Sequence, residues 1–154
     1  MNISLGERRP AKMPRQLLAI MVGSISAVAA NVAYYFFLKE MVGVKFIAPQ
    51  DARFDPPGIS PLPATDVLIF SLVYCTGAGI VFLIVANTVR MPAVVFVTIS
   101  SVVLFLSLFL PFLMPTPPIP ILTEISLDSM HILGAAVLIP LLVAIGLPIE
   151  SVET

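Results

Sequence analysis

Residues 92–113 read PAVVFVTISSVVLFLSLFLPFL, an apolar run that contains no charged side chain. A helix needs about 20 mostly apolar residues to cross the roughly 30 Å hydrocarbon core of a bilayer, and this run is long enough. Backbone polar groups in lipid must be satisfied within the segment, so a helix is expected. The run is also too long and too uniformly apolar for a barrel strand. It therefore predicts a membrane-spanning helix that begins at Pro92, where the missing N–H is not needed.

Three more runs share this character. The predicted spans cover approximately residues 17–38, 67–89, 92–113 and 126–147. Thr65 or Asp66 is expected to cap the N-terminus of the second span. Pro140 is expected to kink the fourth span, because its ring removes one hydrogen bond of the helix. The sequence thus predicts an all-α fold, a polytopic membrane protein built as a four-transmembrane-helix bundle over residues 17–149.

The composition excludes several classes of protein. Of the 154 residues, 58% are hydrophobic and 11% charged, with a mean hydropathy of +1.06. A soluble domain carries roughly 45–50% apolar and about 25% charged residues, so a soluble or disordered chain is disfavoured. The formal charge of -1 shows no excess of basic residues of the kind that binds a nucleic acid. A single cysteine and a single histidine exclude a disulfide framework and multi-residue Cys or His metal sites within one chain.

The chain outside the spans divides into a basic tail (1–16), a long loop (39–66) and an acidic tail (150–154). Lys and Arg in short flanks are enriched on the cytoplasmic side of a membrane. Five of the 8 basic residues lie in the N-terminal tail or at Arg90, and the other three lie in the long loop. This distribution predicts an N-in/C-in protein with both termini in the cytoplasm and the long loop outside.

The first span has a competing interpretation. Its basic start and the Ala-Val-Ala triplet at 27–29 fit the pattern of a cleaved signal peptide. Hydrophobicity continues to Leu38, however, which favours a retained membrane span.

Polar residues within or beside the spans are the candidate site. Ionisable residues inside a span are functional candidates, and the middle of every span lacks them, which argues against proton-coupled transport within one chain. The candidates lie toward the outer boundary and are Asn31, Asp66, Asp128 and His131. Asp128 and His131 are three residues apart, so they share a helix face and are expected to pair. One interpretation is an outward-facing polar pocket. The other is packing, in which the pair fixes the helix in register and the Asn31 amide bonds a neighbouring helix.

Cofactor and catalytic chemistry have few candidates. His131 is the one candidate ligand for haem, pigment or metal. Nothing in the sequence marks a nucleophile beside Asp128 and His131, so no catalytic residue is predicted. Cys75 has no charged neighbour in its span and is expected to be a buried, inert thiol. No bound cofactor or metal is predicted.

Three local features resemble a known family. Asn31 comes late in the first span, Pro61-Leu62-Pro63 precedes the second, and Ser129-Met130-His131 in the fourth is followed by Leu138-Ile139-Pro140. The chain resembles the small, uncharacterised four-span bacterial integral membrane proteins that are grouped as a domain of unknown function. The resemblance implies a bacterial inner-membrane protein, and it assigns no activity.

These observations support three hypotheses. The first is a non-enzymatic integral membrane protein, free-standing or an accessory subunit of a larger membrane complex. The second is a small oligomeric transporter or channel with a polar pocket at Asn31, Asp128 and His131. The third is a membrane protein that binds a cofactor through His131. The expected partners are the lipid bilayer and other membrane subunits or a second copy of the chain, with no nucleic acid.

Overall fold

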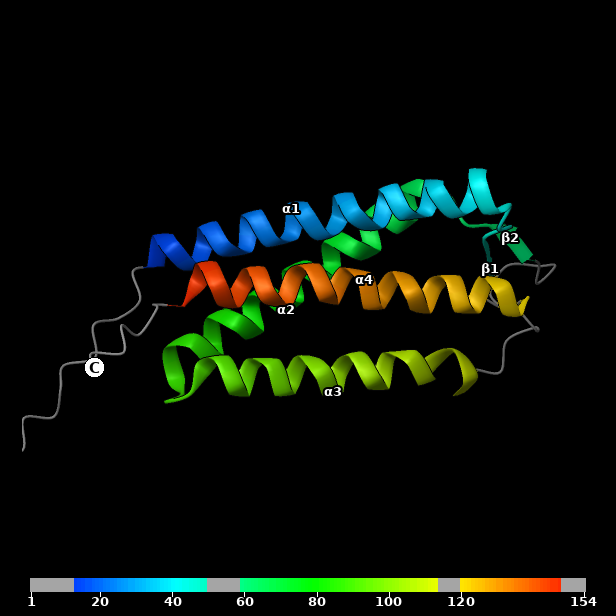
Figure 1. The fold of residues 1–154 in the computed structure, drawn as a ribbon. Coiled ribbons are helices and arrows are strands. Elements are labelled where there is room, and N and C mark those ends of the chain that lie inside the picture. Colours follow the sequence, from blue (N-terminus) through cyan, green and yellow to red (C-terminus); the bar gives the residue numbers. More distant parts are fainter. Residues whose placement is uncertain (1–12, 50–58, 114–119, 148–154) are drawn as a thin grey trace, which may run out of the picture.

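Four long helices make up most of the described chain (Figure 1). The computed structural model describes residues 13–49, 59–113 and 120–147. The helices are α1 (Met13–Phe37), α2 (Ala64–Thr88), α3 (Pro92–Leu113) and α4 (Ile121–Gly146). Each is long and apolar enough to cross a membrane. The predicted all-α, four-helix architecture of a multi-pass membrane protein is therefore confirmed.

Prolines set the start of two helices. Pro63 and Pro120 are the N-cap residues of α2 and α4. The Pro63 carbonyl accepts the amide of Asp66 at 3.1 Å, and the Pro120 carbonyl accepts the amide of Thr123 at 2.8 Å. The predicted side-chain cap at Thr65 or Asp66 is wrong, because the helix already begins at Ala64 and its N-cap makes no side-chain hydrogen bond. Proline suits this position because its ring fixes φ near the helical value. It also has no backbone N–H, so no donor there needs a hydrogen-bond partner.

Three helices begin before their predicted spans, and α2 does so by three residues, at Ala64. α1 begins at Met13 rather than Leu17, and α4 begins at Ile121 rather than Ser126. A helix can continue past the end of its apolar run, because its backbone hydrogen bonds also form outside lipid. α4 continues through Pro140 without a break.

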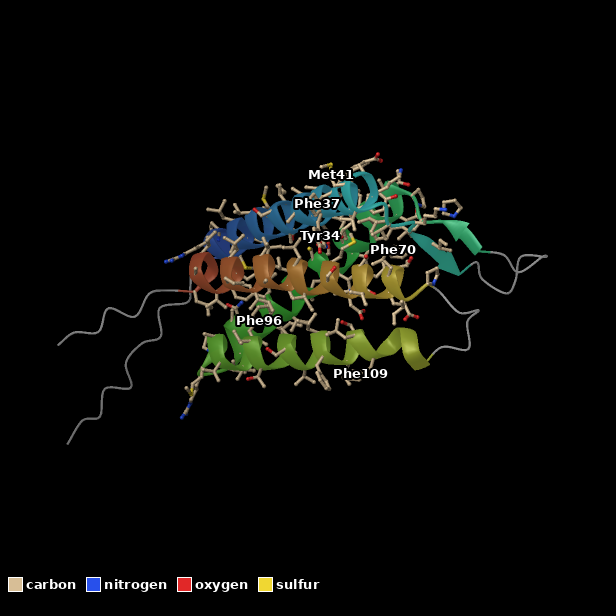
Figure 2. All side chains as sticks on the ribbon, turned by 45° about the vertical axis from the view of Figure 1, so that its right-hand side comes forward. Tyr34, Phe37, Met41, Phe70, Phe96 and Phe109 are labelled. Atoms are coloured by element: carbon tan, nitrogen blue, oxygen red, sulfur yellow. The ribbon has the colours of Figure 1, made fainter. Side chains whose placement is uncertain are left out.

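The helices pack in an uneven arrangement. α1 lies alongside α4, and α3 lies on the other side of α4 (Figure 1). α2 crosses the bundle obliquely, packs on α1, and comes close to α3 at the turn that joins them (Figure 1). The core here contains Phe82 and Phe96, whose rings meet edge-on at 5.2 Å. Figure 2 shows Phe96 on the side of α3 that faces the other helices, whereas Phe109 lies on the opposite side.

The end of the bundle where α1 ends and α2 and α4 begin is called the hairpin end. Here a π-helical turn (Leu38–Val42) stops at Gly43, whose φ of 78° lies in the left-handed region. Two short antiparallel strands follow, β1 (Ile47–Pro49) and β2 (Ile59–Pro61), with Ile47 opposite Pro61. They are the only strands in the described residues.

The hairpin is tied to the helix ends by hydrogen bonds and apolar contacts. The Tyr35 hydroxyl donates to the Leu62 carbonyl at 2.8 Å. The Thr123 hydroxyl donates to the Lys45 carbonyl at 2.9 Å. Below these bonds lies a second apolar cluster, formed by Tyr35, Leu38, Val44, Phe46, Leu62, Val67 and Met130. The described part of the 39–66 loop therefore covers the ends of α1, α2 and α4.

The opposite end of the bundle, called the turn end, holds the start of α1, the end of α4 and the turn between α2 and α3. Arg15 of α1 donates a hydrogen bond to the Ile145 carbonyl of α4. Asn87 of α2 donates to the buried Gln16 side chain of α1 at 3.2 Å. The described chain therefore enters and leaves the bundle at the same end, as an even number of spans requires.

Candidate functional site

A cavity of about 740 Å³ lies between α2, α3 and α4, with one contribution from α1. It forms because α2 crosses α1 while α3 stays alongside α4, so α2 and α3 are closely joined only near the turn (Figure 1). Its volume falls in the range of about 300–1,000 Å³ that is typical of small-molecule sites. The wall is mostly aliphatic and aromatic. The polar side chains along it are Asn31, Ser71, Tyr74, Ser100, Ser107 and His131.

Asn31 lies where three helices meet. Its Nδ2 donates to the Ser71 hydroxyl of α2 at 3.1 Å. On α4, Gly134 lets the amide approach so closely that a Cβ at that position would lie 3.0 Å from Nδ2. The Asn31 Oδ1 atom is buried and has no hydrogen-bond partner among the residues that the structure describes. The predicted interhelical amide bond is therefore present, and it leaves one acceptor unused.

His131 lines the same cavity from α4. Its Nδ1 lies 2.9 Å from the Leu127 carbonyl of its own helix. A carbonyl oxygen only accepts, so Nδ1 carries the proton in this contact, and in the neutral ring Nε2 is an acceptor. The Tyr74 ring meets the imidazole edge-on, with the centroids 5.9 Å apart. The cavity therefore contains a cluster of polar side chains from three helices.

Two of the four predicted site residues lie outside this cluster. Asp128 does not line the cavity, and its Oδ1 is buried with no hydrogen-bond partner in the described part of the chain. Asp128 and His131 make no ion pair there either, since the one ion pair in the described ranges joins Lys39 and Glu40. Asp66 lies in the first turn of α2 and does not line the cavity. The two residues share a helix face but do not approach within ion-pair distance, and the His131 Nδ1 contacts its own backbone.

Three cavity residues were missed as functional candidates in the sequence: Ser71, Tyr74 and Gly134. Ser71 is the buried partner of Asn31, and Tyr74 the aromatic partner of His131. A small residue one turn after His131 was a signal for close approach of another helix, but it does not say which side chain approaches. Cys75 is buried and free, as expected. Residues 13–49, 59–113 and 120–147 contain no group of three or more His, Cys, Asp or Glu side chains that could hold a metal ion.

Comparison with known proteins gives one family. The family model described as "Family of unknown function (DUF6069)" matches residues 11–145, nearly the whole chain. No curated protein and no solved structure matches the chain. The match agrees with the resemblance found in the sequence.

Proposed function

Because the chain belongs to the DUF6069 family, whose function is unknown, we propose a function from the structure: a non-enzymatic membrane protein that binds a lipid-soluble molecule between α2, α3 and α4. The observation that carries this proposal is the 740 Å³ cavity with an apolar wall and a small cluster of polar side chains. A mostly apolar pocket with a few convergent polar groups is the usual form of a small-molecule site.

The route of entry supports a guest that comes from the bilayer. The cavity lies between membrane-spanning helices, and Phe70 and Val73 of its wall are more than half exposed on the surface of α2. In the membrane this surface faces lipid or another membrane protein. A lipid-soluble molecule can therefore reach the cavity without crossing water.

The proposed orientation places the turn end in the cytoplasm of a bacterial cell, with the protein in the inner membrane. Arg15 and Arg90 lie at the turn end, and the basic residues 8, 9 and 12 precede α1 in the sequence. The hairpin end carries Lys39 and Lys45. The positive-inside rule favours the end with more basic residues as the cytoplasmic one.

The test fills the cavity. Gly77 lines the cavity, and a Cβ at this position would meet no atom within 4 Å. We expect wild-type protein purified in mild detergent to carry a bound apolar molecule that extraction and mass spectrometry detect. Gly77→Phe should lose this molecule. The matched control is Ala136→Phe, at an exposed position of α4 outside the cavity, which should retain it. Equal content in the two variants, or no bound molecule in wild type, contradicts the proposal.

A second candidate function, that of an accessory subunit, is favoured by the surface of α3. In its described part, Phe96 is the one buried hydrophobic residue. Large apolar side chains cover the rest of the helix and are at least 39% exposed: Val94, Val97, Ile99, Val102, Val103, Phe105, Leu106 and Phe109. A partner helix or a second copy would bury this surface. Copurification of a stoichiometric membrane partner that Phe105→Ala weakens supports this role, whereas a monodisperse monomer in mild detergent opposes it.

The transporter and cofactor hypotheses stay predictions with a simple test. Both depend on His131, which lies in the cavity. Flux in liposomes that His131→Ala abolishes would favour transport. A haem or metal spectrum lost in the same variant would favour a cofactor protein.

A further inference from the structure

A second cavity, of about 760 Å³, lies at the hairpin end of the bundle. Its wall is made by the end of the first helical run, by residues 43–47 and by residues 61–64. The buried side chains in this wall are Tyr35, Val44, Phe46 and Leu62. The described residues that line the cavity include two lysines, Lys39 and Lys45, and no Asp or Glu. The cavity therefore combines an apolar wall with two positive charges.

Both lysines are positioned at this cavity by contacts with neighbouring elements. The Lys39 Nζ lies 6.0 Å from the centre of the buried Tyr35 ring, and an ammonium group over an aromatic face is attracted to it. The Lys45 carbonyl accepts the Thr123 hydroxyl of α4 at 2.9 Å, which ties the backbone at this lysine to the bundle. The two charges thus belong to ordered parts of the hairpin end.

The charge of the two lysines is only weakly compensated within the described part of the chain. Glu40 approaches Lys39, but the contact spans 3.9 Å between exposed side chains, and an exposed ion pair contributes little. Two like charges at one cavity repel each other, and an anion bound between them relieves this repulsion. Lysine is a common ligand of phosphate groups in proteins. A phosphate is therefore a suitable anion for this site.

The depth of the cavity matches the level of phospholipid head groups. Lys39 directly follows the apolar run 17–38, and Ala64 lies three residues before the run 67–89. The head groups lie just outside the hydrocarbon core, and aromatic rings collect at the same level. In the wall, the Tyr35 and Phe46 rings lie 4.6 Å apart. A phospholipid can therefore place its phosphate at the lysines and its first acyl carbons against this aromatic pair.

We propose that the hairpin-end cavity binds the head group of an anionic phospholipid, with the phosphate at Lys39 and Lys45. Leu62 lies in the wall of both cavities, but neither lysine lines the cavity between α2, α3 and α4. The inference therefore goes beyond the proposed function and does not depend on it. A soluble phosphate shares the charge of the head group but lacks the acyl chains, and the experiment separates the two sources.

The experiment reads lipid binding at the cavity by tryptophan fluorescence, because the chain has no tryptophan of its own. Ile47→Trp places a reporter in the cavity wall. The full chain is reconstituted in dioleoyl phosphatidylcholine with a small share of quencher lipid, which carries a nitroxide near the head-group end of one acyl chain. Phosphatidylglycerol quencher should bind about tenfold to thirtyfold more tightly than phosphatidylcholine quencher, since each lysine near a membrane surface contributes roughly fivefold.

A second reporter measures the general attraction of lipid to the protein. Phe109→Trp lies on the outward side of α3 (Figure 2), on a helix that reaches the hairpin end (Figure 1) and contains no charged residue. Phe109 is 48% exposed, so the reporter contacts lipid directly. Here the ratio of phosphatidylglycerol to phosphatidylcholine affinity should be close to one.

Charge-removing variants locate the phosphate. In the Ile47→Trp protein, Lys39→Gln and Lys45→Gln should each lower the affinity ratio about fivefold, and together they should bring it close to one. Quenching by phosphatidylcholine should stay as it was, which shows that the cavity still forms. The matched control is Arg90→Gln, which removes one positive charge at the turn end. It should leave the ratio unchanged.

The outcomes decide between a lipid site and its alternatives. A ratio near one at Ile47→Trp, an equal preference at both reporters, or a preference that survives the double lysine substitution overturns the proposal. Inorganic phosphate and sodium chloride at equal ionic strength should weaken the preference equally, by screening. If phosphate alone displaces the lipid, the site binds a soluble anion, and the lipid assignment is wrong. Gly77→Phe should leave the ratio unchanged, because Gly77 lines only the other cavity.

Discussion

Single atoms of the core decide how closely the helices approach. Gly146 near the end of α4 is the tightest contact of this kind, because a Cβ built there would lie 2.5 Å from the Phe82 ring of α2 and 3.1 Å from the Ala19 Cβ of α1. Phe82 is fully buried and packs against Phe96, so its ring has no free direction to move. Between membrane helices, where lipid is as apolar as the side chains, such close contact supplies much of the packing energy.

Gly146→Ala is therefore expected to destabilise the protein by about 1–3 kcal/mol, the usual cost of overpacking. Reversible unfolding in mixed micelles measures the change. Gly77→Ala is the control, since open space surrounds that position. It should be neutral or stabilising by up to about 1 kcal/mol, because alanine favours a helix more than glycine. Equal effects of the two substitutions would show that the Phe82 contact is not the cause.

The bond between Asn31 and Ser71 makes a second prediction at this scale. A double-mutant cycle with Asn31→Ala and Ser71→Ala should give a coupling free energy of about 0.6 kcal/mol, the average for interhelical hydrogen bonds in a membrane. Thr76 supplies a control for the hydroxyl, because it bonds the Leu72 carbonyl of its own helix at 2.8 Å. Asn31→Ala combined with Thr76→Ala should be additive. Additivity in the Asn31–Ser71 cycle would mean that this bond contributes no net stability.

At the scale of elements, the hairpin joins helix ends that are distant in the sequence. β2 leads into α2, and its neighbour Leu62 donates its amide to the Phe46 carbonyl at 3.0 Å. The Leu62 carbonyl accepts the Tyr35 hydroxyl of α1. The Lys45 carbonyl accepts Thr123 of α4. A two-stranded hairpin is marginal alone in water, so these contacts with the helices are expected to hold it in place.

Tyr35→Phe tests this connection, because it removes one hydrogen bond and keeps the ring that packs on Phe46. The bond contributes about 0.5–1.5 kcal/mol, so amide hydrogen exchange of Leu62 should become roughly two- to tenfold faster. Tyr34→Phe is the matched control, since the Tyr34 hydroxyl makes no hydrogen bond in the described residues. Unchanged exchange in Tyr35→Phe, or the same acceleration in both variants, would contradict the assigned role.

At the scale of the whole molecule, the two ends of the bundle differ in character. The hairpin end is covered by the described part of the 39–66 loop and by an apolar cluster. The turn end holds a short α2–α3 connection with Arg90 and the Arg15 contact to α4. Two exposed methionines mark these ends, Met41 at the hairpin end and Met91 at the turn end. Figure 2 labels Met41 beyond Phe37 on the surface of the first helical segment.

The predicted orientation is tested with these two positions. The two cysteines are introduced in a Cys75→Ala background. Met41→Cys should react with a membrane-impermeant maleimide in cells whose outer membrane is permeabilised and whose inner membrane is intact. Met91→Cys should react only after the inner membrane is permeabilised. The physical reason is the excess of basic residues at the turn end, which favours its retention in the cytoplasm. The reverse labelling pattern would place the termini outside.

The existence of the four helices was predictable from the sequence, and for α3 even the boundaries agree: Pro92–Leu113 was expected and is observed. Hydrophobic length is a local property, and a lipid environment permits no other regular structure for such a run. The helix starts at Met13 and Ile121 were harder to predict from the sequence, because polar residues at a helix end carry no hydropathy signal. The hairpin was missed because its strands are short and depend on contacts with Tyr35 and Thr123.

The sequence by itself determined the helical class, the number of spans and the polar residues Asn31 and His131 near one boundary. Only the tertiary structure decided that Asn31 meets Ser71 and Gly134, that Asp128 stays outside, and that a cavity lies between α2, α3 and α4. The physical reason is that these helices are apolar on every side. In lipid no face is driven inward by its hydrophobicity, so the packing partners depend on the fit of small and large side chains between helices. That fit is a property of helix pairs and cannot be read from one segment alone.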